Sequence, residues 1–281
     1  MEFSNQEIAE YYNTTQNHYE NWWKLNEVHA LHYGVWDKET KNFTQSLINT
    51  NRTLMRIANV SSSDKVLDAG CGVGGTCFFL NKTKGVKVTG ISLSEKQITT
   101  AKITATKIGC SDDVQFHVMD YCNTSFESET FDVVWACESM CHAADKNNFL
   151  KECYRVLKRG GRLIISDYFL SPHQSDKNNW IDKWINTWGV PEVILEKKFT
   201  EYAIDNDFEK VHSMDLTHKI RKTARRMYRF SLIGALPSEM YNILHPNVSR
   251  FAKNHYKCGY YQYKALQNNL WKYKAILAVK E

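Results

Sequence analysis

Long hydrophobic runs are missing from this chain of 281 residues, and so are closely paired cysteines and, near its end, acidic side chains. No apolar run approaches the roughly 18 residues that a membrane-spanning helix needs, so we expect no transmembrane segment. The first residues are polar and acidic, unlike a secretory signal. None of the eight cysteines forms a Cys-x-x-Cys pair, and several lie in apolar segments. We therefore expect buried thiols and a cytoplasmic location.

The shortage of acid near the end makes the charge uneven. Residues 216–281 hold 13 basic and two acidic side chains, although the whole chain has a formal net charge of only +5. Six of these cations fall within residues 219–229, where Arg221, Arg225 and Arg229 would share one face of a helix. Three interpretations stay open: a solvated helix surface, an anion site for a diphosphate or carboxylate, and contact with anionic lipid or nucleic acid.

Apolar runs alternate with helical segments between residues 60 and 170. Strands are expected at 65–70, 87–92, 114–120, 131–138 and 162–169, with helices at 76–84, 94–109 and 145–158. This alternation predicts a mostly parallel sheet covered by helices on both faces. Later, Trp180, Trp184 and Trp188 recur at four-residue spacing on an expected helix that ends at Pro191. Strands at 208–217 and 271–281 flank a basic helix and a tyrosine-rich helix at 251–269.

The expected fold is α/β and Rossmann-like, with a seven-stranded sheet. We expect an N-terminal helical cap over residues 1–60 and a core that holds the ligand over residues 61–170. Residues 171–281 should complete the sheet and form a helical lid over the strand ends, since helices interrupt the late strands.

The run VLDAGCGVGG at residues 66–75 is the sharpest local feature: a strand, a glycine-rich turn and a helix. Its glycines also fit the dinucleotide pattern, so they cannot decide between ligands. Asp68, at the end of the strand, would meet a cationic ammonium but repel a pyrophosphate. The next strand ends in Ser92, where a dinucleotide enzyme places an acid for the ribose. The two side chains favour S-adenosylmethionine over NAD.

Further motifs follow in order: VTGISLSEKQ, VMDY, FDVVWACESM and YRVLKRGGRLIISD. Together with the turn, they resemble the class I S-adenosylmethionine-dependent methyltransferases over residues 60–170. The HYGVWD element at residues 32–37 extends the resemblance to a small-molecule branch, which includes sterol, tocopherol, cyclopropane-fatty-acid and prenyl-diphosphate C-methyltransferases. The resemblance implies methyl transfer to a small, largely apolar metabolite, with carbon methylation favoured. An O- or N-methyltransferase is the alternative.

The resemblance also assigns residues to the cofactor. They are Asp68, Gly70, Gly72, Ser92, Leu93, Gln97, Asp120, Tyr121 and Tyr33. Many members hold the ribose with an acid, whereas this chain has Ser92 and Gln97. The alternative for Gln97 is a capping box with Ser94 at the start of a helix. Asp120 would accept from the adenine amine, or else only cap its loop.

Candidate catalytic groups follow the fourth strand. Glu138 is the first candidate for a base, because burial at the end of an apolar strand would raise its pKa. The alternative is a hydrogen bond to the methionine ammonium or to a backbone amide. His142 is the second candidate, against a helix-capping role, and His32 is the third.

Acceptor contacts are expected from the aromatic and basic segments. The candidates are Trp36, Trp180, Trp184, Arg221, Arg225 and Arg226, although the tryptophans could instead pack in the core. Mg2+ is expected only with a diphosphate acceptor, and no residue is assigned to a metal. No Asn/Asp-Pro-Pro-Tyr motif of base methyltransferases occurs, so we expect no nucleic-acid partner and at most peripheral membrane contact. A nucleic-acid or membrane-surface binding protein that keeps a cofactor fold is the competing hypothesis.

Overall fold

Seven strands form one sheet in the order β3-β2-β1-β4-β5-β7-β6. The computed structural model describes the chain apart from residues 1, 2, 24 and 173. The strands are β1 (Lys65–Ala69), β2 (Lys87–Ser92), β3 (Val114–Val118), β4 (Phe131–Cys137), β5 (Leu157–Leu170), β6 (Phe208–Asp215) and β7 (Trp271–Lys280). The first five strands are parallel, and β7 lies antiparallel between β5 and β6. The expected mostly parallel sheet is confirmed.

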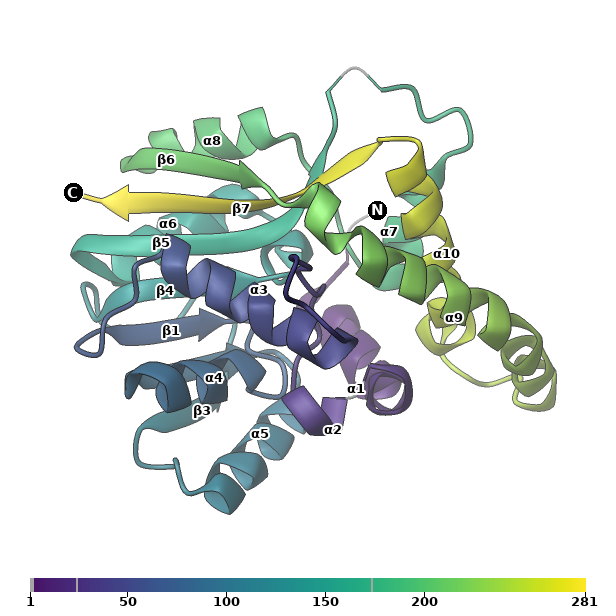
Figure 1. Ribbon diagram of the computed structural model, residues 1–281, viewed down its shortest axis with the longest axis horizontal. Helices are drawn as coiled ribbons and strands as arrows, with labels where there is room; N and C mark the ends of the chain where they lie inside the picture. The colour runs from purple at the N-terminus through teal and green to yellow at the C-terminus, as the bar shows by residue number, and fades with distance from the viewer. Residues whose placement is uncertain (1–2, 24, 173) are drawn as a thin grey trace.

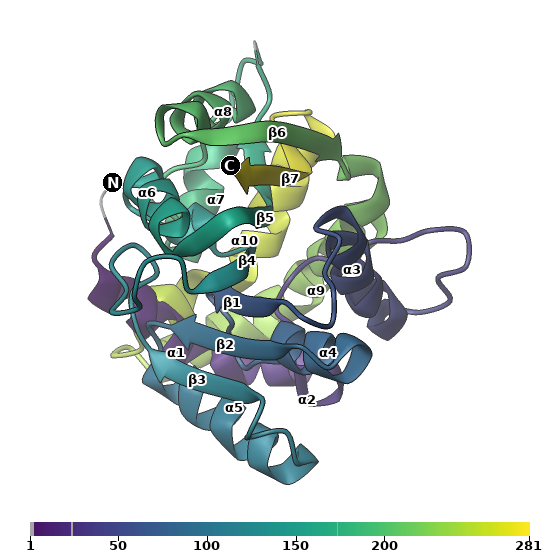
Figure 2. The ribbon, with the colours of Figure 1, turned by 90° about the vertical axis from the view of Figure 1, so that its left-hand side faces the viewer.

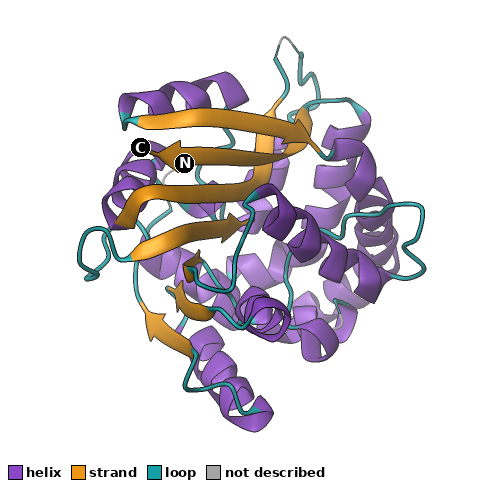
Figure 3. Ribbon diagram, turned by 60° about the vertical axis from the view of Figure 1, so that its left-hand side comes forward, coloured by secondary structure: helices purple, strands orange, loops and turns teal. Residues whose placement is uncertain are grey.

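Helices cover both faces of this sheet (Figures 2 and 3). They are α3 (Phe43–Ile57), α4 (Gly75–Lys84) and α5 (Glu95–Ile108) on one face, with α6 (Lys146–Val156) and α8 (Glu196–Asp205) on the other. Successive side chains of β1 point to opposite faces of the sheet, so each face has its own hydrophobic core. Val66 packs with α3, α4 and α5, whereas Leu67 packs with α6 and α8. α8 was not expected from the sequence.

A second group of helices lies beyond the carboxyl ends of the parallel strands (Figure 1). It consists of α1 (Asn5–Trp22), α2 (Leu25–Val28), α7 (Trp180–Trp188), α9 (Thr217–Leu244) and α10 (Arg250–Gln267). α10 packs against α7, α9 and α1, so the first helix and the last helix of the chain lie side by side beyond this edge of the sheet. These helices are the N-terminal cap and the late insertions that the sequence predicts.

Most helices and strands begin and end close to the residues that the sequence predicts, but some boundaries differ. α7 ends at Gly189, which has a left-handed φ of 66°, two residues before the expected stop at Pro191. β5 begins at Leu157, immediately after α6, because the chain pairs with β4 there before the glycines are reached. All eight cysteines are unpaired, as expected. Among the described helices, none combines the length and apolarity needed to cross a membrane.

Candidate active site

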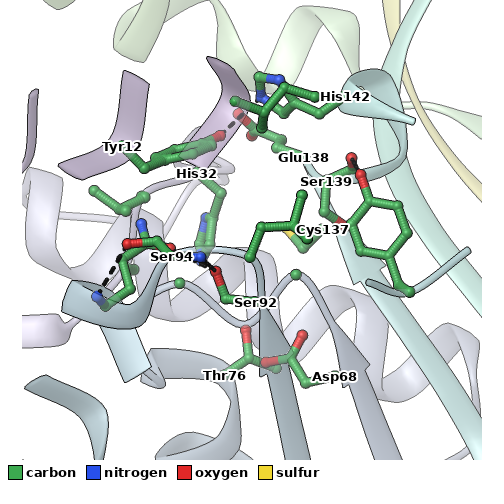
Figure 4. Close-up of a pocket in the computed structure, with 18 of the residues that line it drawn as sticks. Tyr12, His32, Asp68, Thr76, Ser92, Ser94, Cys137, Glu138, Ser139 and His142 are labelled. Carbon is green, nitrogen blue, oxygen red and sulfur yellow. Dashed lines mark hydrogen bonds between the residues drawn. The ribbon is translucent and has the colours of Figure 1, made fainter. Parts of the chain in front are cut away.

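Two cavities open at the carboxyl edge of the sheet. The turn cavity lies over the glycine-rich turn and is lined by residues from α1, β1, β2 and the loop after β4 (Figure 4). The helix cavity lies between α9 and α10 and has a volume of about 420 Å³. Leu31, Glu138 and Trp188 line both, so the two cavities share a wall.

Glycine is required in the turn for two reasons. Gly70 has a φ of 94°, and a Cβ there would lie 2.3 Å from Cβ of Ser139. The Ser139 hydroxyl donates to the carbonyl of Ala69 at 2.6 Å, which fixes the loop after β4 against the turn. Gly72 has a φ of 54° and faces Leu31 across the turn cavity. Side chains at these positions would displace the loop or fill the cavity.

We expect Gly70→Ala to destabilise the chain by more than about 2 kcal/mol, because it combines a left-handed backbone with a steric clash. Gly109→Ala is the matched control: its φ is 75°, but a Cβ there meets nothing within 4 Å. The control should cost only about 1 kcal/mol. Urea denaturation compares the two, and equal losses would contradict the steric argument.

Asp68 is a buried carboxylate at the end of β1. Its side chain is 2% exposed, and the Cys77 thiol donates to Oδ2 at 3.2 Å. Burial raises the pKa of Asp68 to about 7, against the lowering effect of that thiol. Among the described residues, no lysine or arginine forms an ion pair with it. The turn cavity therefore suits a ligand that brings a positive charge.

Ser92, the last residue of β2, and Gln97, in the first turn of α5, form a buried pair. The Ser92 hydroxyl donates to Oε1 of Gln97 at 2.9 Å and accepts the Ser94 N–H at 3.2 Å. Ser94 caps α5 by accepting the Gln97 N–H at 3.1 Å. Half of the expected capping box is therefore present, but the Gln97 side chain turns to Ser92 and lines the turn cavity with it. Leu93 lines the same wall.

Of the two residues that were expected around an adenine ring, Tyr121 lines the turn cavity and Asp120 does not. Tyr121 lines the turn cavity, and its hydroxyl donates to the carbonyl of Ser139 at 2.8 Å. Asp120 is not among the lining residues. Its Oδ1 accepts the Cys122 N–H, as a loop cap would, and its Oδ2 accepts the Asn5 side-chain amide of α1, both at 2.8 Å. Asp120 thus ties the N-terminal cap to the loop after β3 and acts as the loop cap that was the alternative.

Glu138 is the centre of a buried network in the shared wall. Its backbone is left-handed, with a φ of 53°, which turns the side chain back toward the sheet. Oε1 accepts the Tyr273 hydroxyl at 2.7 Å and the Tyr33 N–H, and Oε2 accepts the Tyr168 hydroxyl. Tyr168 and Tyr273 face each other across β5 and β7. Burial raises the pKa of Glu138 to about 8, although all three hydrogen bonds oppose the shift.

These raised pKa values predict how stability depends on pH. A carboxyl group whose folded-state pKa is raised keeps a proton that the unfolded chain has released, so stability falls as pH rises through that window. For Glu138 the window runs from about 4.5 to 8, and for Asp68 from about 3.8 to 7. Burial lowers the pKa of His32 and His142 from 6.5 to about 4, so their opposite effect levels off only above about pH 7.

Between pH 7 and 8, the free energy of unfolding of the ligand-free chain should therefore fall by at most about 1.4 kcal/mol per pH unit, chiefly because of Glu138. Urea denaturation at three pH values measures the slope. Glu138→Gln should flatten it. A constant or rising stability over this range would contradict the assignment.

His142 and His32 are both neutral, but they differ in whether the ring nitrogen Nε2 accepts a hydrogen bond. In His142, Nδ1 lies 3.1 Å from the carbonyl of Gly189 and must carry the proton, since a carbonyl only accepts. Its Nε2 then accepts the Tyr12 hydroxyl at 2.7 Å. His32 likewise donates to the carbonyl of Tyr33 at 3.0 Å, but its buried Nε2 has no hydrogen-bond partner among the described residues. Both line the turn cavity and neither lines the helix cavity.

The helix cavity is apolar and aromatic, with a few polar groups. The rings of Tyr33, Tyr168 and Trp188 form its inner end beside Glu138. Gln262 accepts the Tyr33 hydroxyl at 2.6 Å, while its buried Nε2 has no hydrogen-bond partner in the described part of the chain. The described residues that line this cavity include no lysine or arginine. It therefore suits an apolar ligand with a polar atom to meet Gln262.

The expected acceptor contacts lie outside both cavities. Trp36 donates through Nε1 to Thr223 Oγ1 at 3.0 Å, and Trp180 packs between Tyr260 and Tyr261. Trp184 is fully buried behind Trp188, with ring centroids 5.8 Å apart. The sequence could not separate core packing from cavity lining for these side chains.

The expected cations also point elsewhere. Arg221 and Arg225 are exposed, and Arg226 lies over the rings of Phe43 and Phe230 at 4.6 and 4.4 Å. The face of α9 toward the cavity belongs instead to Met227 and its helical neighbours. Among the described residues, no group of three or more His, Cys, Asp or Glu is placed to hold a metal ion.

Comparison with known proteins identifies the part of the chain that carries this site. Residues 67–165 match the family described as a methyltransferase domain. The chain contains a methyltransferase domain. Its glycine-rich turn and Glu138 both lie in the matched segment, and the class I methyltransferase fold that the sequence predicts is confirmed.

Relatives of this methyltransferase domain act on varied molecules. A 27-O-demethylrifamycin SV methyltransferase of Amycolatopsis mediterranei is 36% identical over 142 residues, which cover 50% of this chain and 52% of that protein. A sterol 24-C-methyltransferase of Eremothecium gossypii is 31% identical over 174 residues, 62% of this chain and 45% of that protein. The chain thus spans about half the length of these curated relatives.

A solved structure covers the whole chain. A geranyl diphosphate methyltransferase in complex with GPP and sinefungin superposes with a TM-score of 0.81 at 19% identity, covering 99% of both chains. At this identity the likeness shows the fold, including the helices beyond the strand ends, and leaves the acceptor open.

Sequence reasoning missed the residues that surround Glu138 in space but lie far from it along the chain. Tyr168 and Tyr273 lie within strands that were expected, but their meeting depends on the pairing of β5 with β7. Trp188 and Gln262 come from the inward faces of α7 and α10. Tyrosines inside otherwise apolar strands were the available signal, because a buried hydroxyl needs a partner.

Proposed function

We propose that the chain is a methyltransferase that uses S-adenosylmethionine to methylate a small, largely apolar acceptor, with Glu138 as the base. One observation carries this proposal: Glu138 lies in the wall that the turn cavity shares with the helix cavity. A group there touches both a cofactor in the first cavity and an acceptor in the second. This is the position that proton removal during transfer requires.

The residues of the turn cavity fit this cofactor. S-Adenosylmethionine, when bound, supplies an electrophilic methyl group on a sulfonium. Asp68 would meet its ammonium group and thereby keep its own carboxylate ionised. The Ser92–Gln97 pair and the free Nε2 of His32 offer hydrogen-bonding groups to the ribose hydroxyls. The glycine turn leaves space for close approach of the backbone.

The helix cavity favours a carbon acceptor. An alkene carbon that takes a methyl group leaves a carbocation, which must then lose a proton. The faces of Tyr168, Trp188 and Tyr33 lie beside the place where that charge develops, and aromatic faces attract cations. Glu138, ionised, receives the proton. The sterol 24-C-methyltransferase among the relatives supports a carbon acceptor.

Oxygen methylation is the second candidate, supported by the rifamycin relative. A hydroxyl acceptor could reach Nε2 of Gln262 with its oxygen and give its proton to Glu138. His142 is less suited to this role, since its acceptor nitrogen is engaged by Tyr12 and it does not line the helix cavity.

A diphosphate acceptor finds no support in the geometry. The described lining of the helix cavity has no cation, and Arg221 and Arg225 lie on the outside of α9. Burial of a diphosphate without cations is costly. We therefore expect sterol-like, terpenoid or quinone acceptors and no requirement for Mg2+.

The test is transfer of a labelled methyl group from S-adenosylmethionine to an acceptor panel with and without Mg2+. The panel contains sterols, terpene alcohols, quinols, amines and prenyl diphosphates, and mass spectrometry locates the methylated atom. We expect label on a neutral apolar acceptor, without metal. Transfer only to a prenyl diphosphate with Mg2+ would contradict the acceptor class.

Blocking the helix cavity gives a structural check. A Cβ at Gly234 would enter open space, so Gly234→Trp should fill the cavity without backbone strain. We expect KM for the acceptor to rise at least about tenfold while cofactor affinity stays unchanged. Gly234→Ala is the control and should behave like the wild type. An unchanged KM in the tryptophan variant would place the acceptor elsewhere.

A further inference from the structure

The outer face of α9 is basic in its first half and apolar in its second half. Counted at 100° per residue, Arg221, Arg225 and Arg229 share one face, and the same face continues with apolar side chains. The exposed apolar residues of the C-terminal half are Leu232, Ile233, Leu236, Met240, Ile243 and Leu244. Their exposed fractions run from 50% to 78%. We call this set the α9 tip.

The α9 tip projects from the body of the fold. In Figure 1, α9 runs away from the sheet, and its end, with the turn into α10, is the farthest point of the molecule on that side. Its neighbour over this stretch is α10. The tip is therefore a convex apolar end beside a basic stretch, on a segment whose acids, Glu239 and Glu281, are outnumbered by 13 cations. Glu239 itself pairs with Lys257 at 3.4 Å.

The helix cavity opens at this same tip. Ile233 and Tyr241 line the cavity and yet are 64% and 53% exposed, so they stand at its mouth. The inward face of α9 borders the cavity, and the outward face carries the exposed apolar side chains. Apolar side chains therefore stand beside the mouth of the cavity.

We propose that the α9 tip inserts into the surface of an anionic membrane, with the outer cations of α9 at the phosphate headgroups. The 13 residues that bear these apolar side chains, 232–244, span about 20 Å as a helix, which is shorter than the roughly 30 Å of a bilayer core. It fits a helix that lies in the interface. A membrane would also deliver an apolar acceptor to the cavity mouth, a point that rests on the proposed function.

Other occupants fit less well. A second copy that paired parallel with this face would set Arg221, Arg225 and Arg229 against their equivalents, and like charges repel. Antiparallel pairing of two tips would leave Arg221, Arg225 and Arg229 outside the contact, so a second copy gives the basic stretch no partner. An acidic protein would satisfy the charge but cover the cavity mouth.

Vesicle sedimentation tests the proposal with the full chain and no cofactor. We expect binding to phosphatidylcholine vesicles with about 30% phosphatidylglycerol, little binding to phosphatidylcholine alone, and weaker binding as salt rises. Leu236→Asp/Ile243→Asp and Arg225→Glu/Arg229→Glu should each weaken binding roughly tenfold or more. Matched controls on α5, Ile103→Asp and Lys102→Glu/Lys107→Glu, change exposed side chains elsewhere and should bind like the wild type.

The outcomes separate this proposal from the proposed function. Asp68→Ala should still bind vesicles, and Leu236→Asp/Ile243→Asp should still bind S-adenosylmethionine. No binding to anionic vesicles at about 50 mM salt, or equal binding by the tip variants, would overturn the proposal. So would a dimer, seen by sedimentation equilibrium, that the aspartate pair dissociates, because it would assign the surface to a second copy.

Discussion

Glu138→Gln is expected to lower kcat by about 10² to 10⁴ while leaving the affinity for S-adenosylmethionine within a few fold. The amide keeps the size of the side chain, and its oxygen can still accept from Tyr273 while its NH2 group faces the Tyr168 hydroxyl, which can turn to accept from it. It cannot take a proton. Rapid-quench measurement of product in a single turnover separates this chemical step from binding and product release.

The pH profile gives an independent reading of the same residue. The base must be ionised, and burial raises the pKa of Glu138 to about 8, so the rate should rise with pH through a value at or below 8. A positive charge in the neighbouring cavity would move that value downward. The rise should disappear in Glu138→Gln.

Glu152→Gln provides a matched control. Glu152 is also a buried carboxylate, but it accepts from Thr124 and Arg155 and lines neither cavity. Its loss should lower stability and leave kcat unchanged. Wild-type kcat in Glu138→Gln, or equal losses in both variants, would remove Glu138 from the catalytic step.

Asp68→Ala should weaken S-adenosylmethionine binding by at least about 100-fold. The carboxylate is buried and lacks a cationic partner in the described part of the chain, so the cofactor ammonium is its natural partner. Removing one member of a buried charge pair costs roughly 3 to 5 kcal/mol. Isothermal titration calorimetry measures the change directly.

Asp68→Asn should lose nearly as much affinity, since it keeps the shape and removes the charge. Asp132→Ala is the control: this carboxylate pairs with Lys158 at 2.9 Å, is partly exposed and lines neither cavity. Wild-type affinity in the asparagine variant would show that shape, and not charge, holds the cofactor.

The local part of this site could be predicted from the sequence. A strand, a glycine turn and a helix are adjacent in the chain, so the geometry around Gly70 and Gly72 follows from backbone preferences alone. Ser92, at the end of β2, was found for the same reason. Its partner Gln97 is five residues away, and the alternative of a capping box proved half right, because the N-cap bond to Ser94 forms without the return bond.

The non-local part could not be predicted. The raised pKa of Glu138 was expected from burial, but its partners Tyr168 and Tyr273 meet only when β7 inserts beside β5. Likewise, the charge of residues 219–229 was evident, but whether it faced the cavity depended on the rotation of α9 against α10. That rotation is set by packing side chains, such as Met227 against Gly259, and no local signal encodes it.

The account depends most on the claim that the turn cavity binds S-adenosylmethionine and not a dinucleotide. Calorimetric titration of the wild-type chain with each ligand, at a pH of about 7.5 where Asp68 is mostly ionised, tests this claim directly. We expect one site with a micromolar Kd for S-adenosylmethionine and no detectable heat with NAD. Binding of NAD, or no binding of S-adenosylmethionine, would contradict the account.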